Sequence, residues 1–284
     1  MGFSALAGSI TDSDLTILHT NDMHSRIDPF PNDGGKYAGK GGMARRAQLI
    51  KEIRRREAQV LLLDAGDIFQ GTPYFNLFEG ELEFRLMSQM KYDAATLGNH
   101  DFDNGIPGLE KQLPHADFPF ITSNYDFTNT ALNNSFLPYK VFQKGNISIG
   151  VFGLGIELHG LVGEKLYGNT KYLDPVPVAR EMVQQLRAME CHLVICLSHL
   201  GYRYDHEKIS DQKLAEQVNG IDLIIGGHTH TFMEEPEVVT GPHGQITLVN
   251  QVGFGGINLG RIDYKLTRIS GKMTPSSATV KVTN

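Results

Sequence analysis

The stretch of residues 15–24, Leu-Thr-Ile-Leu-His-Thr-Asn-Asp-Met-His, joins a short apolar run to a carboxylate and an imidazole. Short apolar runs bounded by polar residues are typical of buried β-strands. Four more apolar runs are also followed directly by polar side chains: Val60–Asp64, Ala94–Leu97, Leu193–Leu197 and Asp222–Ile225. Five separate strands are therefore expected to carry metal-binding residue types just beyond their carboxyl ends.

Amphipathic helices are expected between these strands. In the first of them, four basic residues lie opposite the apolar ones and are expected to face solvent: Arg46, Lys51, Arg54 and Arg55. The expected helices are Met43–Glu57, Glu81–Met90, Ile106–Leu113, Pro177–Glu190 and Asp211–Val218. Strands that alternate with helices indicate a mixed α/β domain.

The C-terminal part has a different pattern, in which Ile246–Asn250, Ile257–Leu266 and Ala278–Val282 are predicted to be antiparallel strands. Residues 127–135, rich in Asn and Thr, are predicted to form a surface loop. No linker interrupts the pattern, so one domain is expected over residues 13–284.

Residues 1–12 contain Ala-Leu-Ala, which has the small-x-small pattern of a signal cleavage site, without the charged and long apolar regions of a complete signal. We interpret them as the remnant of a leader or as an artificial tail. A leader remnant would place the protein in the periplasm or outside the cell.

The net charge of −6 argues against broad electrostatic capture of a nucleic acid polymer. An anionic substrate would need local positive charge, which bound metal ions supply. No run is apolar and long enough to span a membrane. The two cysteines, Cys191 and Cys196, cannot build a disulfide framework and are expected to be small buried residues.

The polar side chains at the strand ends should meet, because sites in open α/β sheets form outside the carboxyl ends of the strands. The candidate metal ligands are Asp22, His24, Asp67, Asn99, His199, His228 and His230. Imidazole, carboxylate and amide oxygen suit zinc, manganese, iron or magnesium, and the absence of thiolate argues against soft metals.

Five stretches make the sequence recognisable. They are 18–24 (Leu-His-Thr-Asn-Asp-Met-His), 64–67 (Asp-Ala-Gly-Asp), 98–103 (Gly-Asn-His-Asp-Phe-Asp), 198–201 (Ser-His-Leu-Gly) and 226–230 (Gly-Gly-His-Thr-His). From about Leu15 to about Leu266, the chain resembles the calcineurin-like metallophosphoesterase superfamily, and specifically the catalytic domain of the 5′-nucleotidase and UDP-sugar hydrolase family. The resemblance implies a four-layer αββα sandwich of two mixed β-sheets flanked by helices.

The resemblance also implies two divalent metal ions. One would be held by Asp22, His24, Asp67 and His230, and the other by Asp67, Asn99, His199 and His228. His100 and Asp103 match the catalytic pair of the family, whereas we interpret Asp101 as structural. Some relatives carry Gln in place of His230, so this position varies within the family.

The implied function is hydrolysis of phosphate esters, nucleotides first among them, by a water that two metal ions activate. Two dications and two aspartates leave the site at about +2, which suits a phosphate dianion. Three alternatives remain open. The chain could be a non-catalytic or partner-dependent metal-binding subunit, a 2′,3′-cyclic phosphodiesterase or a sulfur-ester hydrolase.

Nucleotidases of the family carry a second, C-terminal domain that grips the base and ribose. The chain is expected to lack that domain, since its pattern matches the catalytic domain alone. Specificity would then come from the catalytic domain itself or from a separately encoded nucleotide-binding domain. In either case the expected substrate is a small-molecule phosphate ester.

Overall fold

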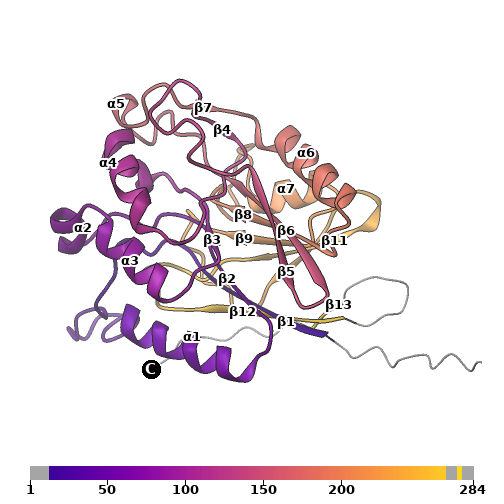
Figure 1. Ribbon diagram of the computed structural model, residues 1–284, viewed down its shortest axis with the longest axis horizontal. Helices are drawn as coiled ribbons and strands as arrows, with labels where there is room; N and C mark the ends of the chain where they lie inside the picture. The colour runs from indigo at the N-terminus through magenta and orange to yellow at the C-terminus, as the bar shows by residue number, and fades with distance from the viewer. Residues whose placement is uncertain (1–12, 267–273, 277–284) are drawn as a thin grey trace, which may run out of the picture.

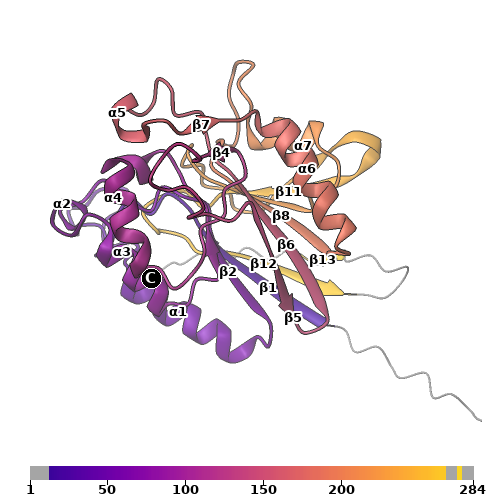
Figure 2. The same ribbon diagram turned by 45° about the horizontal axis from the view of Figure 1, so that its top comes forward.

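The computed structural model describes residues 13–266 and 274–276 and contains two β-sheets stacked between two groups of helices (Figures 1 and 2). The first sheet has the strand order β13-β12-β1-β2-β3. Its strands are β1 (Ser13–Thr20), β2 (Val60–Asp64), β3 (Ala94–Ala95), β12 (Gly260–Leu266) and β13 (Thr274–Ser276). β1, β2 and β3 are parallel, and β12 runs antiparallel to both of its neighbours.

The second sheet has the strand order β10-β11-β9-β8-β6-β5. Its strands are β5 (Tyr139–Lys144), β6 (Ile147–Leu154), β8 (Leu193–Ser198), β9 (Leu223–Gly226), β10 (Glu237–Thr240) and β11 (Ile246–Asn250). The four inner strands are parallel, and the edge strands β5 and β10 are antiparallel to their neighbours. A short pair, β4 (Tyr125–Asp126) and β7 (Lys171–Tyr172), lies apart from both sheets.

The helices cover the outer faces of the two sheets (Figure 1). Over the first sheet lie α1 (Met43–Arg56), α2 (Pro73–Phe78), α3 (Glu81–Gln89) and α4 (Gly105–Gln112), and over the second lie α6 (Pro175–Ala188) and α7 (Asp211–Gln217). The remaining helices are short: α5 (Glu164–Tyr167), η1 (His100–Phe102), η2 (Leu113–His115) and η3 (Pro242–Gly244).

Three apolar clusters hold the four layers together, because successive side chains of a strand point to opposite faces. In β2, Leu61 and Leu63 pack against the second sheet, whereas Val60 and Leu62 pack against the first group of helices. In β8, the alternate residues Val194 and Cys196 face α6 and α7 instead. The expected four-layer sandwich is thereby confirmed.

The five expected helices are present, with ends within two residues of the predicted ones. The strand expected at Ala94–Leu97 is confined to Ala94–Ala95. The predicted strand Ala278–Val282 lies outside the described residues, as do residues 1–12. Residues 127–135 form no helix or strand, but Phe127 and Leu132 are buried, so the segment is anchored in the core rather than lying wholly on the surface.

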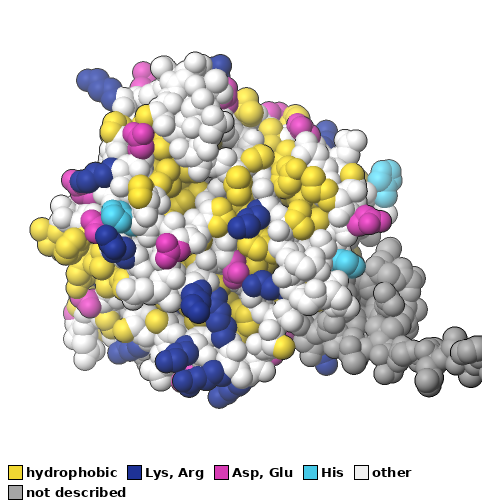
Figure 3. Space-filling view, in the orientation of Figure 1, with side chains coloured by type: hydrophobic (Ala, Val, Ile, Leu, Met, Phe, Trp, Pro, Cys, Tyr) yellow, Lys and Arg dark blue, Asp and Glu magenta, His cyan; other side chains and the backbone are white. Residues whose placement is uncertain are grey.

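The prediction that Arg46 faces solvent is wrong, because its side chain is completely buried. Its guanidinium donates to the carbonyl oxygen of Gly256 at 3.3 Å. A Cβ atom at Gly256 would lie 1.5 Å from Arg46 Nη2, so only a glycine lets the two segments approach this closely. The other basic residues of α1 remain accessible, and Figure 3 shows Lys and Arg side chains gathered where α1 lies in Figure 1.

Cys191 and Cys196 are buried and free, as expected. In the described part of the chain, no helix combines the length and apolarity needed to cross a bilayer.

Candidate metal centre

The polar residues singled out from the sequence lie in the loops that leave five strands. Asp22 and His24 follow β1, and Asp67 follows β2. Asn99 and His100 follow β3, His199 follows β8, and His228 and His230 follow β9. Each of the five strands is parallel to a neighbour in its sheet. Their carboxyl ends bring together residues that are more than two hundred positions apart in the sequence, such as Asp22 and His228.

The first group of candidate ligands consists of Asp22, His24 and His230. Their ligand atoms lie within 4.8 Å of one another. The Nε2 atoms of His24 and His230 are 2.9 Å apart, and His230 Nε2 is 3.3 Å from Asp22 Oδ1. Two imidazole nitrogens and a carboxylate oxygen that converge on one point form a suitable set for a divalent ion.

The second group consists of Asp67, His199 and His228, again with ligand atoms within 4.8 Å of one another. His199 Nε2 is 3.0 Å from Asp67 Oδ2, and the amide oxygen of Asn99 is 2.9 Å from His228 Nδ1. The same Asp67 Oδ2 lies 4.0 Å from His24 Nε2 of the first group. Asp67 therefore stands between the two groups, where a carboxylate can bridge two ions.

Five of the seven candidate ligands have a positive φ angle, which is uncommon for residues other than glycine. They are Asp22, His24, Asp67, His228 and His230, with φ values of 50°, 46°, 55°, 71° and 52°. Such conformations persist only where the surroundings hold them, and they concentrate at functional sites.

Backbone carbonyl groups fix the orientation of two imidazole rings. Nδ1 of His24 is 3.2 Å from the carbonyl oxygen of Phe69, and Nδ1 of His199 is 2.7 Å from that of Ala65. With Nδ1 engaged, Nε2 is the atom turned toward the other ligands. Nε2 of His199 is buried and makes no hydrogen bond of acceptable geometry. Buried polar atoms normally have a partner, so this position suits a nitrogen that binds a metal ion.

The electrostatics of the two groups also suit a cation. Burial disfavours a charged His199, but the Asp67 carboxylate outweighs this effect and raises the pKa of His199 to about 10. Burial and the charge on His199 together lower the pKa of His228 to about 4. Because histidine binds metals in its neutral form, a cation between Asp67 and His199 would take the place of the His199 proton.

His100 lies beside the two groups without belonging to either. Its Nδ1 is 2.9 Å from Asp103 Oδ2, and its backbone N–H donates to Asp67 Oδ1 at 2.8 Å. The hydrogen bond to Asp103 raises the pKa of His100. The His100 ring meets that of His24 edge-on, with centroids 5.4 Å apart.

Asp101, interpreted from the sequence as structural, is the buried anchor of two loops. Its Oδ2 accepts from the backbone N–H groups of Asp67 and Gly98 at 3.0 and 2.7 Å. Its Oδ1 accepts from those of Ile68 and Phe69 at 3.0 and 3.2 Å. One carboxylate thus ties the loop that carries Asp67 to the loop that carries Asn99 and His100.

Two further buried residues position the ligands and were missed in the sequence. The carbonyl and amide groups of the Gln251 side chain bind the loop of residues 227–231, which carries His228 and His230. Asn21 donates to Asp22 and to the carbonyl oxygen of Gly253, and accepts from the N–H of Val252. Gln251 stands outside the five motifs, and Asn21 stands in the first of them without having been assigned a role; each contacts a segment that is distant along the chain.

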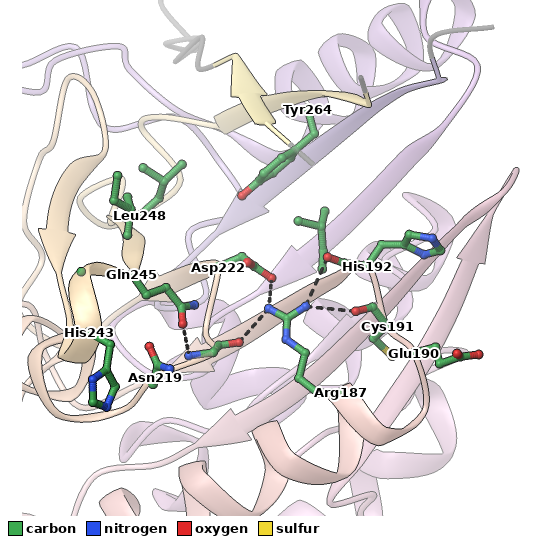
Figure 4. A pocket seen from close by; sticks show the side chains of 14 residues that line it. Arg187, Glu190, Cys191, His192, Asn219, Asp222, His243, Gln245, Leu248 and Tyr264 are labelled. Carbon is green, nitrogen blue, oxygen red and sulfur yellow. Dashed lines mark hydrogen bonds and ion pairs between the residues drawn. The ribbon is translucent and has the colours of Figure 1, made fainter. Parts of the chain in front are cut away.

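A separate hollow lies at the amino ends of β8, β9 and β11 (Figure 4). It measures about 810 Å³, and its most central cation is Arg187. The Arg187 guanidinium is already engaged by Asp222 and by the carbonyl oxygens of Cys191, His192 and Gly220. Both candidate ligand groups in the described ranges lie at the opposite ends of these strands.

An αββα sandwich with carboxylate and imidazole groups at its strand ends defines a class of metal-dependent phosphoesterases. The chain belongs to the calcineurin-like phosphoesterase family, whose model matches residues 15–232. Members of this family use divalent metals, in agreement with the two groups of candidate ligands.

The relatives are nucleotidases. The chain is 39% identical over 238 residues to a snake venom 5′-nucleotidase of Crotalus adamanteus, covering 81% of this chain and 39% of the relative. It is 33% identical over 264 residues to human 5′-nucleotidase, covering 85% and 45%. The crystal structure of a 5′-nucleotidase precursor from Thermus thermophilus matches with a TM-score of 0.82 at 32% identity, covering 94% and 55%. The chain thus spans less than half the length of the two curated relatives.

Proposed function

We propose that this chain is the catalytic unit, residues 13–284, of a metal-dependent phosphoesterase that acts on nucleotides. The observation that carries the proposal is the position of Asp67 between two groups of candidate ligands, with His100 attached to the same carboxylate. The 5′-nucleotidase names of the relatives favour a nucleotide as the substrate.

In this proposal one ion is held by Asp22, His24, Asp67 and His230, and the other by Asp67, Asn99, His199 and His228. The ions, which we propose to be manganese, zinc, iron or magnesium, would activate a water and offset the charge of the phosphoryl oxygens. The donor set fits them because it combines imidazole, carboxylate and amide oxygen without thiolate.

His100 is the proposed proton donor. Its Nδ1 is tied to Asp103, which fixes the ring and leaves Nε2 to give a proton to the departing oxygen of the ester. The hydrogen bond to Asp103 raises the pKa of His100, which favours the protonated form that a proton donor needs. His100 lines a hollow of about 250 Å³ together with His24 and His230, so its ring faces the space where an ester would lie.

Three finer points belong to the same proposal. The substrate is a small-molecule nucleotide rather than a nucleic acid polymer. Recognition of the base falls to the catalytic unit itself or to a second domain. The protein acts in the periplasm or outside the cell, a location that fits the small-x-small pattern in residues 1–12.

Phosphate release tests this function directly. Metal-stripped protein is reloaded with manganese, zinc or magnesium and assayed with a panel of nucleoside monophosphates and with bis(p-nitrophenyl) phosphate. Release from the nucleotides is expected only after reloading. Turnover of the artificial diester alone would assign specificity to a separate domain. A metal-loaded protein that cleaves neither would refute the hydrolase and leave a non-catalytic metal-binding subunit.

Two substitutions separate metal binding from chemistry. His100→Ala is expected to lower kcat by about 10²–10⁴-fold while both ions stay bound, which metal analysis would detect. Asp67→Ala is expected to disturb both ions, since its carboxylate reaches both groups. His159→Ala, at an exposed surface position, is the matched control and should leave turnover unchanged. Full activity of His100→Ala with its metals intact would exclude the assigned role.

A further inference from the structure

The 250 Å³ hollow that contains His24, His100 and His230 has a second wall that no step of the proposed reaction uses. This wall is formed by Arg26, Phe30 and Phe254. Arg26 and Phe30 come from the loop after β1, and Phe254 comes from the loop after β11. The wall therefore lies beside the first group of candidate ligands, on the side of His230.

The Arg26 guanidinium is held in place by stacking rather than by a counter-charge. Its carbon Cζ lies 4.3 Å from the centre of the Phe30 ring. Within the described residues its guanidinium has no hydrogen-bond acceptor and no carboxylate partner, and the side chain is half-buried. Its five N–H donors are thus available to an occupant of the hollow.

A series of ring contacts connects this arginine to the metal centre. The rings of Phe30 and Phe254 meet edge-on with centroids 5.9 Å apart, and Phe254 stacks on His230 at 5.0 Å. Gly255 makes the approach possible, since a Cβ atom there would lie 2.8 Å from the Phe30 ring. Arg26 is therefore preorganised at the rim of the hollow and, among the described residues, forms no ion pair or hydrogen bond with the candidate ligands.

The charge of the site shows what such an arginine would bind. Two dications with Asp22 and Asp67 leave about +2, which already matches a phosphate monoester dianion. Arg26 adds a permanent positive charge beyond that balance. We propose that Arg26, stacked on Phe30, binds a second oxyanion of the substrate, a phosphate or carboxylate on the leaving group. This specificity role rests on the proposed phosphoesterase function.

Matched phosphonates test the proposal without turnover. Metal-loaded protein is titrated calorimetrically with propylphosphonate, 3-phosphonopropionate and propane-1,3-diphosphonate, which share a three-carbon chain and differ in the distal group. The two probes with a distal oxyanion are expected to bind about tenfold more tightly, as one charge-assisted hydrogen bond predicts. Comparison of the two distinguishes a carboxylate from a phosphate as the preferred group.

Variants assign the preference to Arg26. Arg26→Gln is expected to abolish it, and Phe30→Leu to reduce it by removing the stacking surface. Lys36→Gln is the matched control, because Lys36 is an exposed cation over the Tyr37 ring that does not line the hollow. It should leave the preference intact.

Two results would overturn the assignment. Equal affinity of the wild-type protein for all three probes would mean that no second oxyanion is recognised. An equal loss for all three in Arg26→Gln would place Arg26 on the transferred phosphoryl group instead. Neither result bears on the hydrolase itself, which phosphate release from p-nitrophenyl phosphate measures separately.

Discussion

Gln251→Leu tests whether one buried side chain holds the loop of residues 227–231 in its ligand-presenting form. Gln251 is completely buried and lies just after β11. Its amide accepts from the Thr231 N–H and the Thr229 hydroxyl, and donates to the Gly227 carbonyl oxygen. Leucine has a similar volume but no polar atom, so the substitution removes the hydrogen bonds and leaves the packing nearly unchanged.

The expected cost comes chiefly from the Thr231 N–H, which loses its acceptor, because the Gly227 carbonyl oxygen also accepts from the Thr229 N–H at 2.9 Å. A buried backbone group left without a partner costs about 1–3 kcal/mol, and Thr231 is half-buried, so the free energy of unfolding should fall by about 1–2 kcal/mol. For a chain of this size, that corresponds to a melting temperature lower by about 2–8 °C. Because the loop carries two candidate ligands, metal affinity should also fall by about 10–100-fold.

The assay combines thermal unfolding of metal-free protein with calorimetric titration of manganese or zinc. Gln245→Leu is the matched control, because Gln245 accepts from the Gly220 N–H at 2.7 Å in the distant pocket of Figure 4. It should lower stability without changing metal affinity. If Gln251→Leu binds metal as tightly as the wild-type protein, the loop keeps its form without Gln251 and the argument fails.

Three further substitutions test other contacts. Gly256→Ala should destabilise the protein by about 2 kcal/mol or more in thermal unfolding, because its φ is 61° and a Cβ atom would overlap a buried guanidinium. Asp103→Asn should lower kcat without loss of metal, since His100 loses its charged hydrogen-bond partner. Arg187→Met should lower stability by about 2 kcal/mol at neutral pH, because Asp222 loses its ion pair at 2.7 Å. Burial raises the pKa of Asp222 and Arg187 opposes this, so the loss should shrink as acid protonates the carboxyl group.

Matched variants keep the Gly256→Ala and Arg187→Met results interpretable. Gly160→Ala shares a positive φ of 81° but meets no atom within 4 Å, so it isolates backbone strain from steric overlap. Arg180→Met removes an exposed arginine of α6 that donates to Gln217, and its effect should not depend on pH. If Gly256→Ala and Gly160→Ala lowered the free energy of unfolding equally, the steric overlap would be contradicted. Equal losses in Arg187→Met and Arg180→Met would likewise contradict the ion pair. Metal depletion in Asp103→Asn would assign Asp103 a structural rather than a catalytic role.

The helices could be predicted closely because their apolar stripes are local properties of the sequence. Where α6 differs from its prediction, the reason is also local: the Asp174 side chain accepts from the Val176 N–H, and Pro175 occupies the first helical position. The edge strands β5 and β10 were not predicted. Each buries a single hydrophobic residue, Phe142 and Val239 respectively, so neither produces an apolar run.

The candidate ligands could be named from the sequence because they stand in short motifs directly after strands. Asp101 could be interpreted as structural for the same reason, but the roles of Asn21 and Gln251 could not be inferred, since each contacts a distant part of the chain. Asn21 binds the backbone around Gly253, which is 232 positions away. The burial of Arg46 likewise depends on Gly256, 210 positions away, and no helical periodicity contains that information.

The backbone conformation of the candidate ligands explains why they need the buried residues that hold them. Non-glycine residues in left-handed conformations carry strain that the local sequence does not relieve, and five candidate ligands share this conformation. The strain is tolerated because Asp101 binds the loop of Asp67 and Gln251 binds the loop of His228 and His230. The buried polar network and the ligand geometry are therefore one unit. Substitutions in the network should loosen metal binding even where no ligand is changed.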